Sequence, residues 1–285
     1  MKIIGGPSSQ TLACRVAALL QCTPTVTDYV RFPDNEQYLK ILDDVDAKDV
    51  VIIQNTTTDS DLIALLQLLD ACESAKKISV VIPYMGYARQ DKLFNKGEAI
   101  SARAMAKTIA SESLDAVFTI NIHEKSVLDH FTCPAADLDA SSLIGKYISD
   151  LKLHKPLLIA PDAGVKSMVE KMAAGLSLDH DVFEKTRFSG DSIAIKEKPM
   201  DIKGRDVIIV DDMIATGGTM AESVKILYQN SAKDIYTACV HPVLTRNAVL
   251  RLFNAGVKDI ISTDTIEKIQ SRISVAPLIA DALKK

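Results

Sequence analysis

The stretch VIIVDDMIATGGT, Val207–Thr219, decides the fold of this chain. It predicts a strand buried on both faces that ends in two carboxylates, Asp211 and Asp212, before a loop of small residues that opens a helix. Ligands of open α/β folds bind outside the carboxyl ends of the strands. Backbone N–H groups and the positive end of a helix dipole suit a phosphate there, and Gly217 and Gly218 leave the backbone bare for its approach. We therefore expect a phosphate at the loop and ribose hydroxyls on the carboxylates, which only accept hydrogen bonds.

A plainer interpretation of the same stretch is a strand-end turn with solvated acids. A TGGT sequence alone favours that interpretation. An apolar strand followed by two aspartates and then TGGT is much more specific, so the site for phosphate and ribose is the stronger hypothesis.

Short apolar, β-branched runs alternate with helical patterns along the chain, which predicts an α/β fold of mainly parallel sheets flanked by helices. The expected strands are Lys2–Ile4, Val26–Phe32, Asp49–Gln54, Ile78–Ile82, Ala116–Asn121, Leu157–Ala160, Asp206–Val210, Asp234–Val240 and Val257–Ser262. The expected helices are Thr11–Leu20, Ser60–Cys72, Ile100–Ala110, Ala163–Ala174, Met220–Gln229 and Thr245–Asn254.

The order of these elements predicts two similar domains, residues 1–140 and 141–285. The charged segment Glu184–Lys203 interrupts the alternation in the second domain, and it predicts a β-flap with a strand at Ser192–Lys196. The C-terminal segment Pro277–Lys285 predicts a short helix that packs back on the first domain.

Composition excludes several classes of protein. With 285 residues, 47% hydrophobic and 25% charged, the chain is neither disordered nor fibrous and is long enough for a sizeable core. A net charge of −4 argues against a generic nucleic-acid or membrane-surface binder. No apolar run approaches the roughly 18 residues that span a bilayer, and five scattered cysteines without a CxxC pair indicate a reducing compartment. We expect a cytoplasmic protein with no nucleic-acid and no membrane partner.

The stretch Val207–Thr219 resembles the phosphoribosyl-diphosphate loop of the type I phosphoribosyltransferase fold. Two classes share that loop: base phosphoribosyltransferases, and ribose-phosphate pyrophosphokinases, which make phosphoribosyl diphosphate from ATP and ribose 5-phosphate. The residues that the resemblance implies in binding ribose 5-phosphate are Asp211, Asp212, Ala215, Thr216, Gly217, Gly218 and Thr219. Many relatives carry a third acid where this chain has Ala215, which weakens any mechanism with a general base from this loop.

Two segments of the N-terminal half favour the pyrophosphokinase class. Val80–Lys92 closely resembles the nucleotide segment of that family, P-Y-x-x-Y-A-R-Q-D, in which the arginine offers a forked cation to phosphate. Phe32–Glu36 resembles the adenine-site loop, F-x-D/N-x-E, whose aromatic ring stacks on a purine. The residues implied to bind ATP are Phe32, Asp34, Asn35, Glu36, Arg89 and Gln90. Taken alone, either segment would be interpreted as a surface turn.

Two strand ends carry candidate magnesium ligands. Asn121–Glu124 resembles the D-L-H segment of the family and implies a metal role for His123, although Mg²⁺ prefers oxygen and the residues alone favour an ordinary strand-end histidine. Asp162 matches the acid of the P-D-x-G turn of the family and is a hard oxygen ligand. The positions at which many relatives carry further acids are occupied here by Asn121, Thr132 and Ala136.

The flap carries Glu184–Arg187. A lysine and an arginine two apart close over the reacting phosphates in the family, which implies that Lys185 and Arg187 are catalytic and that Arg187 also contacts ribose 5-phosphate. The bare charge pattern would otherwise be interpreted as a solvated loop.

The resemblance covers nearly the whole chain and implies ribose-phosphate diphosphokinase activity. The reaction is the Mg²⁺-dependent transfer of the diphosphoryl group of ATP to the C1 hydroxyl of ribose 5-phosphate, giving 5-phosphoribosyl 1-diphosphate and AMP for nucleotide biosynthesis. The resemblance also implies a homo-oligomer, at least a dimer. Three alternatives stay open: a base phosphoribosyltransferase, a non-catalytic relative that acts as a regulatory subunit, and a purely regulatory effector-binding protein.

Overall fold

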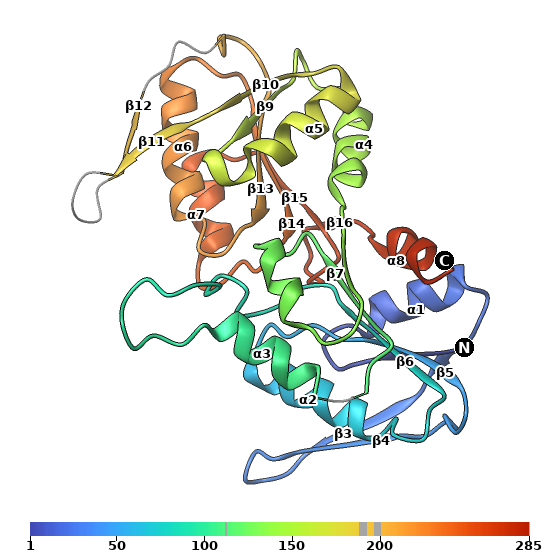
Figure 1. Cartoon of the computed structure of the whole chain (residues 1–285). Coiled ribbons are helices and arrows are strands. Elements are labelled where there is room, and N and C mark those ends of the chain that lie inside the picture. The colour runs from blue at the N-terminus through green and yellow to red at the C-terminus, as the bar shows by residue number, and fades with distance from the viewer. Residues whose placement is uncertain (112, 188–192, 197–200, 285) are drawn as a thin grey trace. The chain divides into compact units, whose positions relative to one another are not determined.

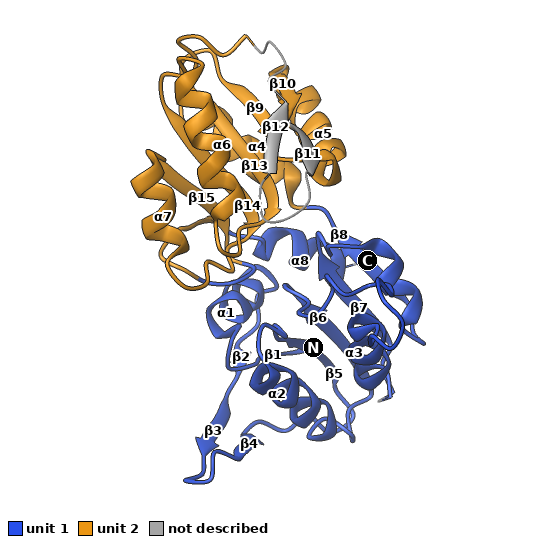
Figure 2. Cartoon of the chain, turned by 90° about the vertical axis from the view of Figure 1, so that its left-hand side faces the viewer, with its two compact units in different colours: residues 1–139, 265–267, 274–285 blue, residues 140–264, 268–273 orange. Residues whose placement is uncertain are grey.

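The computed structural model describes residues 1–111, 113–187, 193–196 and 201–284, and the side chains of residues 184–187 and 193–196 lie outside that description. The chain forms two compact units (Figure 2). Unit 1 contains Met1–Asp139, Thr265–Glu267 and Ser274–Lys285, and unit 2 contains Ala140–Asp264 and Lys268–Ile273.

Unit 1 is built on a parallel sheet with the strand order β2-β1-β5-β6-β7-β8 (Figure 1). These strands are β1 (Lys2–Gly5), β2 (Pro24–Thr25), β5 (Asp49–Ile53), β6 (Lys77–Ile82), β7 (Ala116–Ile120) and β8 (Ala135–Leu138). Their apolar runs, such as Val50–Ile53, are buried, as expected for a parallel sheet covered on both faces.

Helices cover both faces of this sheet. They are α1 (Gln10–Leu19), α2 (Asp59–Asp70), α3 (Ser101–Ile109) and α8 (Ala276–Leu283), with a 3-10 turn at η1 (Lys125–His130). Helices α2 and α3 share a core with one face of the strands, and α8 packs on α1. A capping box of Thr58 and Asp61 begins α2.

Unit 2 repeats this plan with the strand order β10-β9-β13-β14-β15-β16, again parallel throughout. These strands are β9 (Leu157–Ala160), β10 (Asp179–Val182), β13 (Val207–Met213), β14 (Ile235–His241), β15 (Asp259–Thr263) and β16 (Ser271–Ile273). The helices are α4 (Ser141–Asp150), α5 (Lys166–Leu176), α6 (Gly218–Gln229) and α7 (Ala248–Ala255), with a 3-10 turn at η2 (Ala163–Val165). Helices α6 and α7 pack on one face, whereas α4 and α5 pack together on the other.

Each unit inserts an antiparallel hairpin at the same point of its topology. In unit 1 the hairpin joins β3 (Thr27–Arg31) to β4 (Gln37–Ile41), and in unit 2 it joins β11 (Glu184–Arg187) to β12 (Ile193–Lys196). The chain direction across each sheet reverses between the first strand and the strand that follows the hairpin. These switch points, β1/β5 and β9/β13, are where open α/β folds bind ligands.

The predicted α/β fold, with two similar parallel-sheet domains and a flap in the second, is confirmed. The strand predicted at Val26–Phe32 is β3, whereas β4, which pairs with it to form a hairpin at the same position as the flap, was not predicted. No helix in the described part of the chain is long and apolar enough to cross a lipid bilayer.

Candidate active site

The predicted phosphate loop lies at the carboxyl end of β13, beside the switch point of unit 2. Strand β13 continues to Met213, beyond the predicted end at Val210, so Asp211 and Asp212 belong to the strand itself. Helix α6 begins at Gly218, and its N-cap Gly217 has a φ of 68° in the left-handed region. Glycine suits this position because the conformation is strained for residues with a Cβ.

The backbone of this loop is oriented by hydrogen bonds from one side. The carbonyls of Ile214 and Ala215 accept the backbone N–H groups of residues 244 and 245, at 2.8 and 3.0 Å. The carbonyl of Thr216 accepts a bond of 2.8 Å from Nη1 of Arg251. In a planar trans peptide the N–H points opposite to the carbonyl. The N–H groups that follow these three carbonyls therefore face away from residues 244–251.

Three carboxylates lie together at the same edge of unit 2. Asp162 directly follows β9 and Pro161, and its Oδ1 accepts the N–H of Gly164 at 2.9 Å. Burial, followed by repulsion from Asp212 and then from Asp162, raises the pKa of Asp211 well above the ordinary value. Hydroxyl groups or a cation would relieve this repulsion, so the cluster suits a ribose or a metal-bound phosphate.

The corresponding strand end of unit 1, after β5, carries no such acids. Residues 49–56, DVVIIQNT, occupy the place of residues 206–213, DVIIVDDM, so that Gln54 and Asn55 stand where unit 2 has Asp211 and Asp212. Both amide side chains bond within unit 1: Gln54 Oε1 accepts the N–H of Ser8 at 3.3 Å, and Asn55 Oδ1 accepts that of a β6-end residue at 2.7 Å. These amides therefore stabilise the strand end of unit 1, where unit 2 has a cluster of carboxylates.

The predicted nucleotide segment leaves the carboxyl end of β6 and leads to α3. Its start is fixed by the N–H of Gly86, which donates to Oγ1 of Thr56 at 2.9 Å. Arg89 is exposed, whereas the half-buried Gln90 donates from Nε2 to the carbonyl of Lys92 at 3.3 Å. The segment therefore presents a cation to solvent from a backbone that is tied to the sheet.

The predicted adenine loop is the tip of the β3–β4 hairpin. The turn is closed by the N–H of Phe32 on the carbonyl of Glu36 at 2.8 Å, and Asp34 Oδ1 accepts the N–H of Glu36 at 3.2 Å. Asn35 has a φ of 75°, and Phe32 is 47% exposed. The hairpin tip extends beyond the rest of unit 1, whereas α3 packs on the sheet (Figures 1 and 2). Within one chain, the tip and the Arg89 segment lie apart.

His123 lies on an exposed loop of unit 1, just after β7. Asp137 of the neighbouring strand β8 fixes the start of this loop, because its Oδ1 accepts both the N–H of Ile122 and the hydroxyl of Thr119, each at 2.9 Å. Asp137 was not predicted from the sequence; a carboxylate on the strand beside a candidate ligand loop was the available signal.

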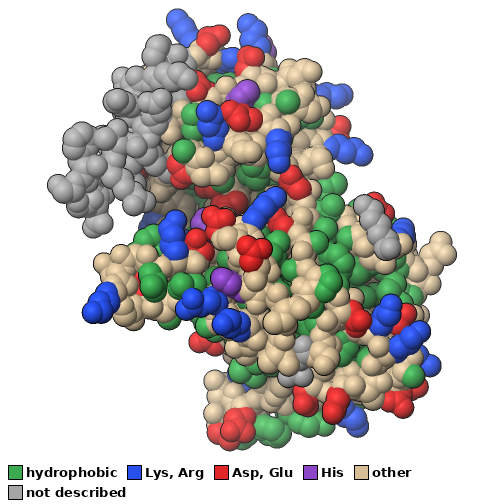
Figure 3. All heavy atoms as spheres, in the orientation of Figure 1, with side chains coloured by type: hydrophobic (Ala, Val, Ile, Leu, Met, Phe, Trp, Pro, Cys, Tyr) green, Lys and Arg blue, Asp and Glu red, His purple; other side chains and the backbone are tan. Residues whose placement is uncertain are grey.

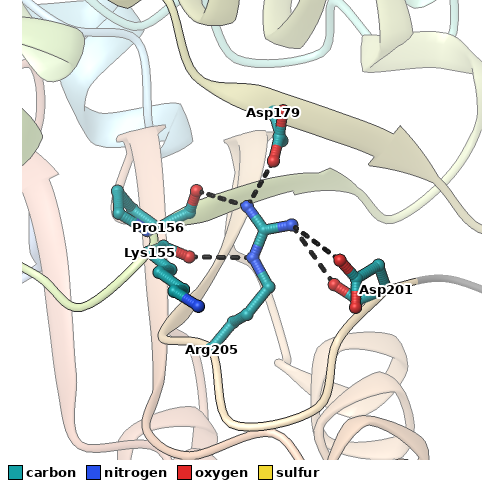
Figure 4. A network of polar contacts seen from close by, with 5 residues as sticks. All are labelled: Lys155, Pro156, Asp179, Asp201 and Arg205. Atoms are coloured by element: carbon teal, nitrogen blue, oxygen red, sulfur yellow. Dashed lines mark hydrogen bonds and ion pairs between the residues drawn. The ribbon is translucent and has the colours of Figure 1, made fainter.

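Lys185 and Arg187 lie on strand β11 of the flap, and their side chains are outside the described residues. Arg205, whose side chain is 10% exposed, lies at the amino ends of β9, β10 and β13 (Figure 4). Its guanidinium donates to the carbonyls of Lys155, Pro156 and Asp201 at 2.9, 3.1 and 3.2 Å and to Oδ2 of Asp179 at 2.7 Å. This network joins one residue that precedes the flap in the sequence, Asp179, and one that follows it, Asp201, to the start of β9.

The donor set fits magnesium only together with a substrate. Within the described residues, no three His, Cys, Asp or Glu side chains are arranged to hold a metal ion by themselves. Mg²⁺ commonly binds through one or two carboxylates plus substrate phosphates and waters. Asp162, beside Asp211 and Asp212, supplies hard oxygen ligands of that kind.

Comparisons with known proteins agree with this geometry. Residues 1–112 match the N-terminal domain of ribose phosphate pyrophosphokinase, and residues 131–274 match the phosphoribosyl transferase domain. The ribose-phosphate pyrophosphokinase of Methanosarcina acetivorans is 61% identical over 285 residues, which is 100% of both chains. Ribose-phosphate pyrophosphokinase 2 of Archaeoglobus fulgidus is 44% identical over 281 residues, 99% of each chain.

A solved structure extends this agreement to the fold. The crystal structure of phosphoribosylpyrophosphate synthetase from Mycobacterium smegmatis matches with a TM-score of 0.88 at 30% identity, and the match covers 100% of this chain and 97% of that one. The matches in sequence run through both the nucleotide segment and the phosphate loop, and on this evidence the chain belongs to the ribose-phosphate pyrophosphokinase family.

Proposed function

We propose that this enzyme transfers the diphosphoryl group of ATP to the C1 hydroxyl of ribose 5-phosphate, giving 5-phosphoribosyl 1-diphosphate and AMP for nucleotide biosynthesis. The observation that carries the proposal is the switch point of unit 2, where Asp211 and Asp212 precede a loop whose N–H groups face one side. Family membership favours this reaction over base phosphoribosyl transfer.

The sugar is held by unit 2. The 5-phosphate binds the N–H groups of Thr216–Thr219, and Asp211 and Asp212 accept hydrogen bonds from the ribose hydroxyls. Ala215 contributes only its backbone, so no general base comes from this loop. The loop thus binds and aims the sugar, and it leaves proton transfer to other groups.

ATP is held by unit 1. Arg89 pairs with its phosphates and Gln90 adds an amide contact. The hairpin residues contact the adenosine, with Phe32 stacking on the base and the polar residues of the tip, Asp34, Asn35 and Glu36, accepting or donating hydrogen bonds.

Diphosphoryl transfer depends on alignment and on charge neutralisation. The C1 hydroxyl oxygen loses its proton to water and bonds to the β-phosphorus, while the bond from the β-phosphorus to the bridging oxygen breaks and AMP leaves with that oxygen. Lys185 and Arg187 stabilise the negative charge that develops, and Arg187 also contacts ribose 5-phosphate. Asp162 and His123 are the residues that would hold Mg²⁺, which would supply further charge neutralisation on the phosphates.

The hairpin supports a homo-oligomer of at least two chains. Val30, Phe32 and Tyr38 expose 49%, 47% and 43% of their surface there. Because the tip lies apart from the Arg89 segment of its own chain, we propose that it completes the ATP site of a neighbouring copy. Light scattering tests the assembly, and a monomer with full activity would contradict it.

We also propose that the enzyme acts in the cytoplasm. All five cysteines are free thiols, and burial raises the pKa of Cys72 to about 12, which makes it unreactive. The net charge of −4 supports the absence of a nucleic-acid or membrane-surface partner, and acidic and basic side chains are intermixed on the face drawn in Figure 3.

The deciding experiment measures AMP released from ATP in the presence of magnesium, with and without ribose 5-phosphate. We expect release that depends on the sugar phosphate, and no comparable release with unphosphorylated ribose. A second reaction, with phosphoribosyl diphosphate and purine bases, tests base phosphoribosyl transfer. Absence of sugar-dependent AMP, or efficient diphosphate release in the second reaction, would overturn the proposal.

A further inference from the structure

Arg251, on α7, contacts the phosphate loop although it lies far from that loop in the sequence. Its Nη1 donates to the carbonyl of Thr216 at 2.8 Å, across 35 residues of chain. We propose that Arg251 is a positioning residue that holds the 5-phosphate loop in its binding conformation, an inference that rests on the proposed binding of ribose 5-phosphate there.

Arg251 differs in kind from the other groups that orient the loop. The carbonyls of Ile214 and Ala215 accept backbone N–H groups, which almost any side chains at those positions would leave in place. The hydroxyl of Thr245 adds only a longer contact of 3.4 Å to the Ala215 carbonyl. The bond to Thr216 is instead made by a side chain, so a substitution at Arg251 removes it.

The peptide that Arg251 holds is the critical one for an anion. The carbonyl of Thr216 and the N–H of Gly217 belong to one planar unit and point in opposite directions. Fixing the carbonyl toward Arg251 therefore aims the Gly217 N–H to the other side of the loop. Gly217 is also the left-handed N-cap residue of α6, and a left-handed residue of this kind is typical of turns whose N–H groups bind an anion. Without the anchor, this peptide loses the side-chain contact that fixes its orientation, whereas the carbonyls of Ala215 and Gly217 on either side keep their backbone hydrogen bonds.

The guanidinium is itself held in place. Its Nη2 donates to Oδ1 of Asn247 at 3.2 Å, one turn earlier along the chain. Nη1 lies 3.4 Å from the position that a Cβ on Gly218 would occupy, so the guanidinium packs directly behind the loop. A positive charge there also reinforces the positive end of the α6 dipole.

Three variants test the role. Arg251→Met removes both the hydrogen-bond donors and the charge, whereas Arg251→Lys keeps the charge but lacks the planar set of guanidinium donors. The matched control, Lys225→Gln, removes an exposed charge from α6. The measurements are the Kd of ribose 5-phosphate by calorimetry, the KM values of both substrates, and the melting temperature.

We expect Arg251→Met to raise the Kd and the KM of ribose 5-phosphate about tenfold or more, the size of one lost charge-assisted hydrogen bond. The KM of ATP should stay within about threefold, Arg251→Lys should recover part of the loss, and Lys225→Gln should behave as wild type. If Arg251→Met does not fold, Arg251→Lys and Asn247→Ala, which frees the guanidinium, decide the question.

An unchanged Kd of ribose 5-phosphate in folded Arg251 variants, or an equal loss for both substrates, would overturn the inference. The wild-type assay keeps the two proposals separate. If wild type binds ribose 5-phosphate more tightly than the folded Arg251→Met variant does but releases no AMP, the proposed reaction fails while the positioning role stands.

Discussion

Asn55 donates a hydrogen bond of 2.8 Å from Nδ2 to the backbone carbonyl of Thr265, 210 residues further along the chain. Both residues are buried, at 1% and 0% exposure. The Oδ1 of the same amide accepts the N–H of Tyr84 at 2.7 Å. One side chain therefore joins the ends of β5 and β6 to the segment by which the chain returns to unit 1, and both its donor and its acceptor are used.

Asn55→Asp should destabilise unit 1. An ionised carboxylate only accepts hydrogen bonds, so it would place a charged oxygen against the Thr265 carbonyl oxygen with no hydrogen bond between them. The site is buried, so water would not solvate the carboxylate either. We expect a loss of about 2–4 kcal/mol in the free energy of unfolding, measured by urea denaturation. The exposed Asn254→Asp is the control and should change it by less than about 0.5 kcal/mol. Equal effects of the two substitutions would contradict the structural role.

Two glycines should respond in opposite ways to the same substitution. A Cβ on Gly86 would lie 1.9 Å from the Thr56 carbonyl oxygen, so the backbone of one of the two residues would have to move. A Cβ on Gly175 in α5 would have no neighbouring atom within 4 Å. Gly86→Ala should cost about 1–3 kcal/mol and weaken ATP binding, because it displaces the segment that carries Arg89. Gly175→Ala should stabilise by about 0.5–1 kcal/mol. Thermal melts compare them, and a neutral Gly86→Ala would show that the segment tolerates a shift.

The sequence predicted the strands that are buried on both faces and missed elements whose stability comes from packing. Strands such as β13 begin with a continuous apolar run, which can be identified from the sequence alone. Strand β10, Asp179–Val182, is polar and partly exposed, so it lacks that signal. Helix α4 carries Gly145, which lowers its helix propensity but lets it approach Met172 of α5, where a Cβ would be 3.2 Å from Cγ. Only the packed structure explains that glycine.

The candidate site divides in the same way. Asp211, Asp212 and the glycine loop were predictable because they are contiguous in sequence and follow a strand. The role of Arg251 was not predictable from the sequence, because its partner is the backbone carbonyl of Thr216, and no pattern of side chains indicates such a contact. The contrast of Gln54 and Asn55 with the two aspartates was visible in residues 49–56 and 206–213, but only the shared topology shows that the two segments are equivalent.

Lys185→Ala should separate catalysis from binding. Lys185 lies on the flap strand β11, where we propose that its ammonium meets the charge that develops on the transferred group. Removing one such cation should lower kcat by about 100-fold or more while the KM of ATP changes only a few-fold. Lys171→Ala, an exposed lysine of α5, is the control for loss of a positive charge. A kcat within a few-fold of wild type would contradict the catalytic role.

Asp211→Asn should make the free protein more stable and its sugar binding weaker. Burial, Asp212 and Asp162 raise the pKa of Asp211, which means that the charged carboxylate is disfavoured in the folded state. In the wild type, Oδ1 of Asp211 accepts the N–H of Asp212 at 2.9 Å. The amide of an asparagine can accept the same hydrogen bond, and it removes the repulsion between the carboxylates. We expect a gain of about 1 kcal/mol at neutral pH, as for other relieved active-site groups. The affinity for ribose 5-phosphate should fall about tenfold because the charged acceptor is lost.

The pH dependence of that gain tests its cause. Because the pKa of Asp211 is higher in the folded state than its ordinary value of 3.8, the native protein binds more protons than the unfolded chain between those two pKa values. Asp211 therefore lowers wild-type stability progressively as the pH rises from about 3.8 through the raised pKa. The advantage of Asp211→Asn should be full above that range and should vanish toward pH 3.8, as measured by urea denaturation at several pH values. An advantage that stays constant with pH would arise from packing instead and would refute the electrostatic explanation.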